Sequence, residues 1–336
     1  MEEQQIFDST IYRVVHGSRA YGTHRPDSDR DEKGVCILSS PRYYYGTLDF
    51  QQKDSGWNDG NDRVIYDIRK FFKLALSCNP NIIEILFVDE NDILQIDELG
   101  TLLRENREMF LSRLAAKTFT GYATSQLDRI RGHKSWIDNA PEKPIEADFW
   151  HLHTLNYGDD PFEREFEGHI INVHSPSGID MPEGLQLALK KIYGDKQFKF
   201  EPPPVIIDHF DKAGFKAAKK KYGQYLDWQK NRNPDRAAIE AEHGFDRKHA
   251  YHLIRLLRMG KEIITEGKVL VRRPDAQELL DIRHGRKFTY DELVEYASQL
   301  RAEVDEAVKS SPLPPNPDYE QAEKLLLNLI SLRLDK

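Results

Sequence analysis

A predicted strand, a Gly-Ser turn and two closely spaced acids follow one another near the start of the chain, and this order constrains the fold most. Residues 11–15 are mainly β-branched and apolar, which is typical of a strand, and Gly17 and Ser18 come directly after them. Backbone N–H groups at a turn that opens a helix point toward an anion. Gly17 would therefore let a phosphate approach closely, and the Ser18 hydroxyl could donate to it.

The two acids are Asp29 and Asp31, with ten residues between Ser18 and Asp29. On a strand, residues two apart project to the same face. Two adjacent carboxylates repel each other unless they share a cation, so this spacing predicts a site for a divalent metal. The alternative is a turn followed by a solvated acidic strand, because Asp-x-Asp alone is common.

Further alternation of strand and helix patterns follows. Residues 34–38 and 63–68 are typical of strands. Apolar residues then recur at helical spacing over 71–78, and Asn79 and Pro80 fit the cap and first position of another helix. This order predicts an α/β (α+β) core.

The chain is expected to comprise three parts. Residues 1–115 form the α/β core, and 116–240 form a poorly assigned insertion or linker, irregular over its proline-rich stretch 132–210. Residues 241–336 form a mainly helical domain that would close the nucleotide site. Helical spacing predicts helices over residues 102–126, 212–230, 249–266, 290–309 and 319–334.

The helix over 249–266 belongs to a second dense motif. Asp246 can cap its start, and Lys248, His252 and Arg255 fall on the side opposite its apolar stripe. That apolar stripe consists of Ala250, Leu253, Ile254, Leu257 and Ile264. Cations on one helix face can clamp a triphosphate, and the alternative is an ordinary solvated surface.

A zinc site at His243, His249 and His252 is the less favoured interpretation of the same segment. His249 and His252 have a spacing that ligand pairs use, but His243 precedes a glycine turn. The neighbourhood is also basic, which disfavours a cation.

The helix predicted over 212–230 mixes lysines with aromatic residues. Its basic side chains include Lys216, Lys219, Lys220 and Lys221, among Phe215, Tyr222, Tyr225 and Trp228. Lysines can neutralise phosphates, and exposed rings can stack on bases. The favoured alternative is an amphipathic helix with its aromatic rings in a core, but the four lysines remain the candidates for nucleic-acid contacts.

Composition excludes several classes of protein. Two cysteines rule out a disulfide framework, and a net charge of -8 rules out a uniformly basic nucleic-acid coat. The sequence has no apolar run of about 18 residues, so it predicts no membrane span. The first residues are acidic and polar, unlike a secretory signal, so we expect a cytoplasmic protein.

Three motifs together resemble a known family. They are Gly-Ser-x-Ala-Tyr-Gly at 17–22, Ser-Asp-x-Asp-x-x-Gly-Val at 28–35, and Asp-x-Lys-His-Ala-x-His-Leu-Ile-Arg-Leu-Leu-Arg-Met at 246–259. The set is similar to the polymerase-β superfamily of nucleotidyltransferases, in its RNA-repair-pathway (RNA-ligase-associated) polymerase-β-like branch. The resemblance covers about 15–90 and 243–295. Arg30 and Glu32 depart from the usual apolar positions of the superfamily, which predicts a poorly buried strand.

The resemblance implies a third acid on a neighbouring strand, and Asp67 suits this role. The alternative is that Asp67 only caps the helix that begins near Arg69. Glu84 is the competitor for the metal site, and otherwise a partner of Arg69 or Lys70.

The implied activity is transfer of a nucleoside monophosphate from an NTP such as ATP to a hydroxyl, with release of pyrophosphate. Two Mg²⁺ ions, or Mn²⁺, would bind Asp29, Asp31 and Asp67. Gly17, Ser18 and Arg19 would contact the nucleotide, and Lys248, His252 and Arg255 would balance the charge of its phosphates.

The implied acceptor is an RNA 3′ end in RNA repair, with an RNA ligase or end-processing enzyme as a partner. Other branches of the superfamily suggest AMP transfer to a protein or small-molecule hydroxyl instead. A nucleotide-sensing or RNA-binding protein without activity is the non-enzyme alternative.

Overall fold

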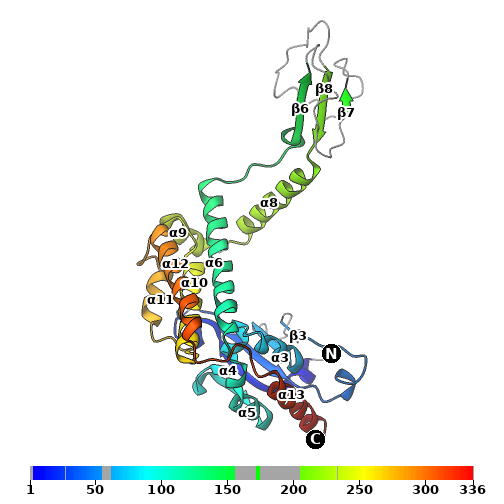
Figure 1. Ribbon diagram of the computed structural model, residues 1–336, viewed down its shortest axis with the longest axis vertical. Helices are drawn as coiled ribbons and strands as arrows, with labels where there is room; N and C mark the ends of the chain where they lie inside the picture. The colour runs from blue at the N-terminus through cyan, green and yellow to red at the C-terminus, as the bar shows by residue number, and fades with distance from the viewer. Residues whose placement is uncertain are drawn as a thin grey trace. The chain divides into compact units, whose positions relative to one another are not determined.

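The computed structural model describes residues 3–26, 28–54, 62–155, 172–174, 205–232 and 234–335. The chain divides into two compact units (Figure 1), of which one comprises residues 1–134 and 235–336 and the other residues 135–234. We call them the main unit and the inserted unit. In the described residues, no helix is both long and apolar enough to cross a membrane.

A five-stranded mixed sheet forms the centre of the main unit, in the order β3-β4-β2-β1-β5. Its strands are β1 (Thr10–His16), β2 (Asp31–Cys36), β3 (Gln52–Lys53), β4 (Arg63–Asp67) and β5 (Ile93–Ile96). β1 pairs antiparallel with β2 and β5, whereas β2 and β4 run parallel. The α/β core predicted from the sequence is confirmed.

Helices from both halves of the chain surround this sheet. The N-terminal ones are α1 (Glu3–Asp8), α2 (Gly17–Tyr21), α3 (Ile68–Leu76), α4 (Pro80–Phe87), α5 (Glu98–Glu105) and α6 (Leu114–Asp138). The C-terminal ones are α9 (Pro234–His243), α10 (Arg247–Glu266), α11 (Ala276–Arg283), α12 (Tyr290–Ala307) and α13 (Tyr319–Leu334). α10 packs against α11 and α12 (Figure 1), and one hydrophobic core joins them to the sheet.

Local capping chemistry sets several helix ends where the sequence predicts them. The Asn79 side chain accepts from the backbone N–H of Asn81 and begins α4, with Pro80 at the first helical position. Asp246 likewise accepts from the N–H of His249 at the start of α10, and Gly267 ends α10 in the left-handed conformation.

β2 is an inner strand of the sheet, and the expectation that it would be poorly buried is wrong. Glu32 is buried, and its carboxylate accepts from Arg13 at 2.5 Å and from Arg63 at 2.9 Å. Burial raises the pKa of Glu32, but the two guanidinium groups outweigh burial and lower the pKa overall. A charged residue is tolerated here because neighbouring strands supply its partners.

The inserted unit contains a small antiparallel sheet, in the order β6-β8-β7. Its strands are β6 (Trp150–Leu155), β7 (Asn172–His174) and β8 (Val205–Phe210), so the prediction of an irregular 132–210 is wrong for these residues. Helix α8 (Lys212–Lys230) has the predicted bounds. Ring contacts of Trp136 with Tyr225 and Trp228 show that the aromatic side of α8 packs within this unit.

Candidate active site

The Gly-Ser turn and the Asp-x-Asp motif meet where β1 ends and β2 begins. His16 is the register partner of Asp31, and Gly17 follows in a left-handed conformation with φ of +67°. A Cβ on Gly17 would lie 2.2 Å from Oδ2 of Asp31. Glycine is therefore required here for both its conformation and its size, and the Asp31 carboxylate lies directly against the turn.

Three aspartates gather at this edge of the sheet, and we call Asp29, Asp31 and Asp62 the acidic group. Burial raises the pKa of Asp31, and the negative charges of Asp62 and Asp29 raise it further, against the opposing effect of Lys33. Asp62 immediately precedes β4, and its carbonyl accepts from the N–H of Glu32 at 2.9 Å. Like charges this close favour a bound cation.

Asp29 is carried by the loop before β2. Arg19 in α2 donates to the carbonyl of Ser28 at 2.7 Å and to that of Asp29 at 3.2 Å. Arg19 therefore shapes the loop that presents Asp29, whose side chain is exposed.

The structure does not bring Asp67 to the acidic group, which corrects the predicted trio. In the parallel pair of β2 and β4, Glu32 lies opposite Arg63, whereas Asp67 lies opposite Cys36 at the other end. Asp67 lies five positions after Asp62, which is about 16 Å along a strand. Asp62, just before β4, is therefore at the same end of the strand pair as Asp31.

Asp67 instead serves the start of α3. Its Oδ1 accepts from the backbone N–H of Arg69 at 3.0 Å and from Nε of the same residue at 2.9 Å. Burial raises the pKa of Asp67, and the Arg69 guanidinium partly offsets that effect. These contacts support the capping interpretation of Asp67.

Lys33 lies two residues beyond Asp31, on the same face of β2, and the sequence reasoning missed it. Its Nζ donates to Oδ1 of Asn81 in α4 at 3.0 Å. Burial lowers the pKa of Lys33 to about 8, although the carboxylates of Glu84 and Asp31 act in the opposite direction. This amine is therefore a nearly buried cation beside the acidic group.

Glu84 lies at the centre of a buried polar network behind the turn. Its carboxylate accepts from Arg255 and from the hydroxyl of Tyr21, both at 2.5 Å, and lies 3.1 Å from Nε2 of His16. Burial opposes ionisation of Glu84, but Arg255 and His16 hold its pKa well below the usual range. The predicted partners of Glu84 were Arg69 or Lys70, but in the structure its carboxylate contacts Arg255, Tyr21 and His16 instead.

The three cations predicted on α10 separate into two kinds. Lys248 is exposed, and its positive charge is among those that lower the pKa of Asp31. His252 is partly exposed, and burial together with Arg255 and Lys248 lowers its pKa well below the ordinary value. Arg255 is buried, pairs with Glu84, and places its guanidinium 3.9 Å from the centre of the Tyr21 ring.

The lysines proposed for nucleic-acid contact lie in the inserted unit. Lys216, Lys219, Lys220 and Lys221 of α8 are all exposed. The ammonium of Lys219 lies 5.3 Å from the centre of the Phe215 ring. The aromatic residues of α8 are partly exposed and make ring contacts, whereas the lysines face solvent and are available to phosphates.

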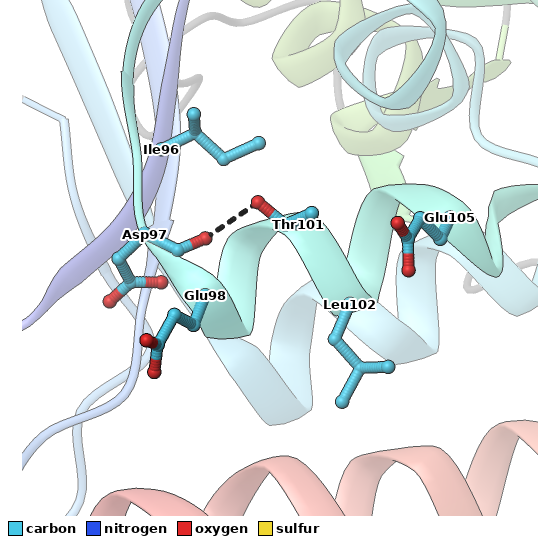
Figure 2. Close-up of a pocket in the computed structure, with 6 residues that line it drawn as sticks. All are labelled: Ile96, Asp97, Glu98, Thr101, Leu102 and Glu105. Atoms are coloured by element: carbon cyan, nitrogen blue, oxygen red, sulfur yellow. Dashed lines mark hydrogen bonds between the residues drawn. The ribbon is translucent and has the colours of Figure 1, made fainter.

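A separate depression lies at the start of α5 (Figure 2). It is lined by Ile96, Asp97, Glu98, Thr101, Leu102 and Glu105. Asp97 caps α5 through Gly100, and the Thr101 hydroxyl donates to its carbonyl at 2.9 Å. Tyr12 pairs with Ile96 and His16 pairs with Asp31, so this depression is at the opposite end of β1 from the acidic group.

Comparison with known proteins agrees with the resemblance that the motifs predict. Residues 1–138 match the RlaP family, described as the RNA repair pathway DNA polymerase beta family, and this range includes the acidic group. An uncharacterized 38.9 kDa protein from the nrdC-mobD intergenic region of Enterobacteria phage T4 is 20% identical over 331 residues, which span 90% of this chain and 91% of the phage protein. No solved structure matches the chain. The resemblance to the polymerase-β-like RNA-repair branch is thus confirmed for the N-terminal part.

Proposed function

We propose that this protein is a metal-dependent nucleotidyltransferase that moves a nucleoside monophosphate from an NTP to a hydroxyl, with an RNA 3′ end as the acceptor. The observation that carries the proposal is the contact between the Asp31 carboxylate and the Gly17 turn, with Asp62 and Asp29 beside it. A phosphate and a divalent cation can meet at such a place because glycine leaves no side chain between them.

The residues present fit a divalent cation. Asp29, Asp31 and Asp62 offer carboxylate oxygens, which are the donors that Mg²⁺ and Mn²⁺ prefer, and their mutual repulsion is relieved by a cation. These three residues would hold the ions, two in number by analogy with the superfamily. Bound there, the ions would lower the pKa of the attacking hydroxyl and neutralise the leaving pyrophosphate.

The chain's own side chains have separate tasks in this proposal. Gly17, Ser18 and Arg19 contact the nucleotide or the loop that frames it. Lys33, Lys248 and His252 provide positive or proton-donating groups for its phosphates. A helical C-terminal part that shares one core with the sheet can hold α10 over the site.

Arg255 acts indirectly in this scheme, as a positioning residue. Its guanidinium is buried against Glu84 and Tyr21, so it orders the side of α2 that follows the Gly17 turn. Glu84 is likewise a positioning residue, which holds Arg255, Tyr21 and His16 together. Asp67 is assigned to the cap of α3.

RNA as the acceptor is supported by the description of the RlaP family and by the exposed lysines of α8. An RNA ligase or an end-processing enzyme is the kind of protein partner that this activity implies. Lysines contribute affinity for any polyanion, so the acceptor must be identified directly.

The test is incubation of the full chain with each α-labelled NTP, Mg²⁺ and a panel of RNA, DNA and protein acceptors. We expect labelled RNA that is longer by one or more nucleotides, no product with Asp31→Asn, and wild-type product with Asp128→Asn, which removes an exposed carboxylate of α6. Labelled protein would identify AMP transfer to protein. Binding of NTP without any product, or full activity of Asp31→Asn, would contradict the proposal.

A further inference from the structure

Two histidines and an aspartate meet where α6 lies beside the start of α10, away from the acidic group. Nδ1 of His133 lies 3.4 Å from Oδ2 of Asp246, and Nε2 of His249 lies 3.5 Å from the same oxygen. The three ligand atoms are all within 4.8 Å of one another. We propose that His133, Asp246 and His249 bind a zinc ion.

The spacing of these atoms suits tetrahedral zinc. With bonds of about 2.0 Å to nitrogen and oxygen, neighbouring ligand atoms of a tetrahedral site are about 3.3 Å apart. Both measured distances to Oδ2 are within a few tenths of an ångström of that value. Two imidazoles and one carboxylate are also a donor set that zinc uses, with a fourth position left for water.

The orientation of His249 gives a second, independent reason for a cation. Its Nδ1 lies 2.7 Å from Oε1 of Gln126 in α6, and an amide oxygen only accepts hydrogen bonds. Nδ1 therefore carries a proton, and Nε2 is the ring nitrogen that faces the Asp246 carboxylate, at 3.5 Å. A metal ion could bind Nε2 and Oδ2 together, and Gln126 is the outer residue that fixes the ring.

Asp246 divides its two oxygens between two tasks. Oδ1 accepts from the backbone N–H of His249 at 3.0 Å and caps α10, while Oδ2 faces both histidines. The side chain is fully buried, so an ion held by Oδ2 would be shielded from water. A zinc ion bound there would tie α6 to the start of α10.

Basic side chains near the cluster argue against zinc in the sequence, but in the structure two of them contact other groups. The Lys134 ammonium lies 5.3 Å from the centre of the Tyr290 ring. Arg247 donates to the carbonyls of Lys287 and Phe288 at 3.0 and 2.7 Å. His243 and His252, which the sequence paired with His249, are not part of the cluster.

The experiment strips the full chain with a chelator, then titrates it with Zn²⁺ against a chromophoric competitor and with Co²⁺ by absorption. We expect one equivalent of Co²⁺ to give the intense visible bands of tetrahedral coordination, and one equivalent of Zn²⁺ to displace it. His133→Gln, His249→Gln and Asp246→Asn, which keeps a cap acceptor, should each weaken binding by about 100-fold or more, and Gln126→Leu by about 10-fold.

One control locates the ion. His243→Gln removes a histidine outside the cluster and should give the tetrahedral Co²⁺ bands at the affinity of the wild type. A wild-type spectrum typical of free, six-coordinate Co²⁺ would overturn the proposal. Wild-type zinc affinity in folded His133→Gln and His249→Gln, checked by circular dichroism, would overturn it as well.

Discussion

The two ends of the β2–β4 strand pair both present buried or half-buried aspartates, but their surroundings differ. At one end, Asp67 contacts the side chain and backbone of Arg69 and caps a helix. At the other end, Asp31 lies against a glycine turn with Asp62 and Asp29 among its charged neighbours. The first end uses its carboxylate to hold the fold together, and the second accumulates negative charge that a ligand can use.

Burial raises the pKa of both Asp31 and Asp67, so burial alone does not separate the two ends. The two aspartates differ in the second-largest influence on their pKa. For Asp31 it is the neighbouring carboxylate of Asp62, and for Asp67 it is the guanidinium of Arg69. A carboxylate that is paired with a cationic side chain of the same protein contributes to stability. Like charges that lie close together lower the stability of the fold and are typical of functional sites.

The largest expected effect concerns Glu84, which is paired like Asp67 but lies beside the acidic group. Arg255→Met leaves the Glu84 carboxylate buried without its guanidinium and should lower the free energy of unfolding by about 3–5 kcal/mol. Urea denaturation measures this change. Arg255→Met combined with Glu84→Gln should recover part of the loss, and a single variant as stable as the wild type would show that the pair does not hold this region.

A smaller effect distinguishes the two ends of the strand pair when the stability of variants at each end is measured in EDTA. Asp67→Ala should cost about 1 kcal/mol because α3 loses its cap, while Asp67→Asn keeps an acceptor and should cost less. Asp31→Asn should be neutral or slightly stabilising, since it removes repulsion from Asp62. Thermal unfolding of the three variants checks this order, and a strongly destabilised Asp31→Asn would break the comparison.

A further effect is a pH dependence that Lys33 gives to stability. Its pKa is about 8 in the folded protein and near 10.5 in the unfolded chain, so the unfolded chain binds more protons between these values. The contribution of Lys33 to the free energy of unfolding therefore rises from about pH 8 to pH 10.5. The difference in stability between wild type and Lys33→Met should shift in favour of the wild type over this window, and a constant difference would show that Lys33 titrates normally.

Local features of the fold could be predicted from the sequence. The strand at 11–15, the caps at Asn79 and Asp246, and the end of α10 at Gly267 depend on neighbouring residues, which a sequence displays directly. The small sheet of the inserted unit depends on pairing between distant segments in a proline-rich context, and it was missed for that reason.

The site was predictable only in part because its assembly depends on strand pairing. Asp29 and Asp31 follow from a local motif, but the proposal of Asp62 in place of Asp67 requires the parallel register of β2 and β4. The position of Asp62 at the start of a strand was an available signal, since parallel strands begin at the same edge of a sheet. Arg255 was predicted to clamp phosphates because it lies opposite an apolar stripe, but its side chain is buried against Glu84.

The most direct test of the account compares the two ends of β4 in one assay. The rate of nucleotidyl transfer is measured for Asp62→Asn and Asp67→Asn under the same conditions as the wild type. Loss of a metal-binding carboxylate removes several kcal/mol of transition-state stabilisation, so Asp62→Asn should be slower by about 100-fold or more. Asp67→Asn should stay within about threefold of the wild type. An active Asp62→Asn beside an inactive, folded Asp67→Asn would contradict the account and return the third acid to the far end of the strand.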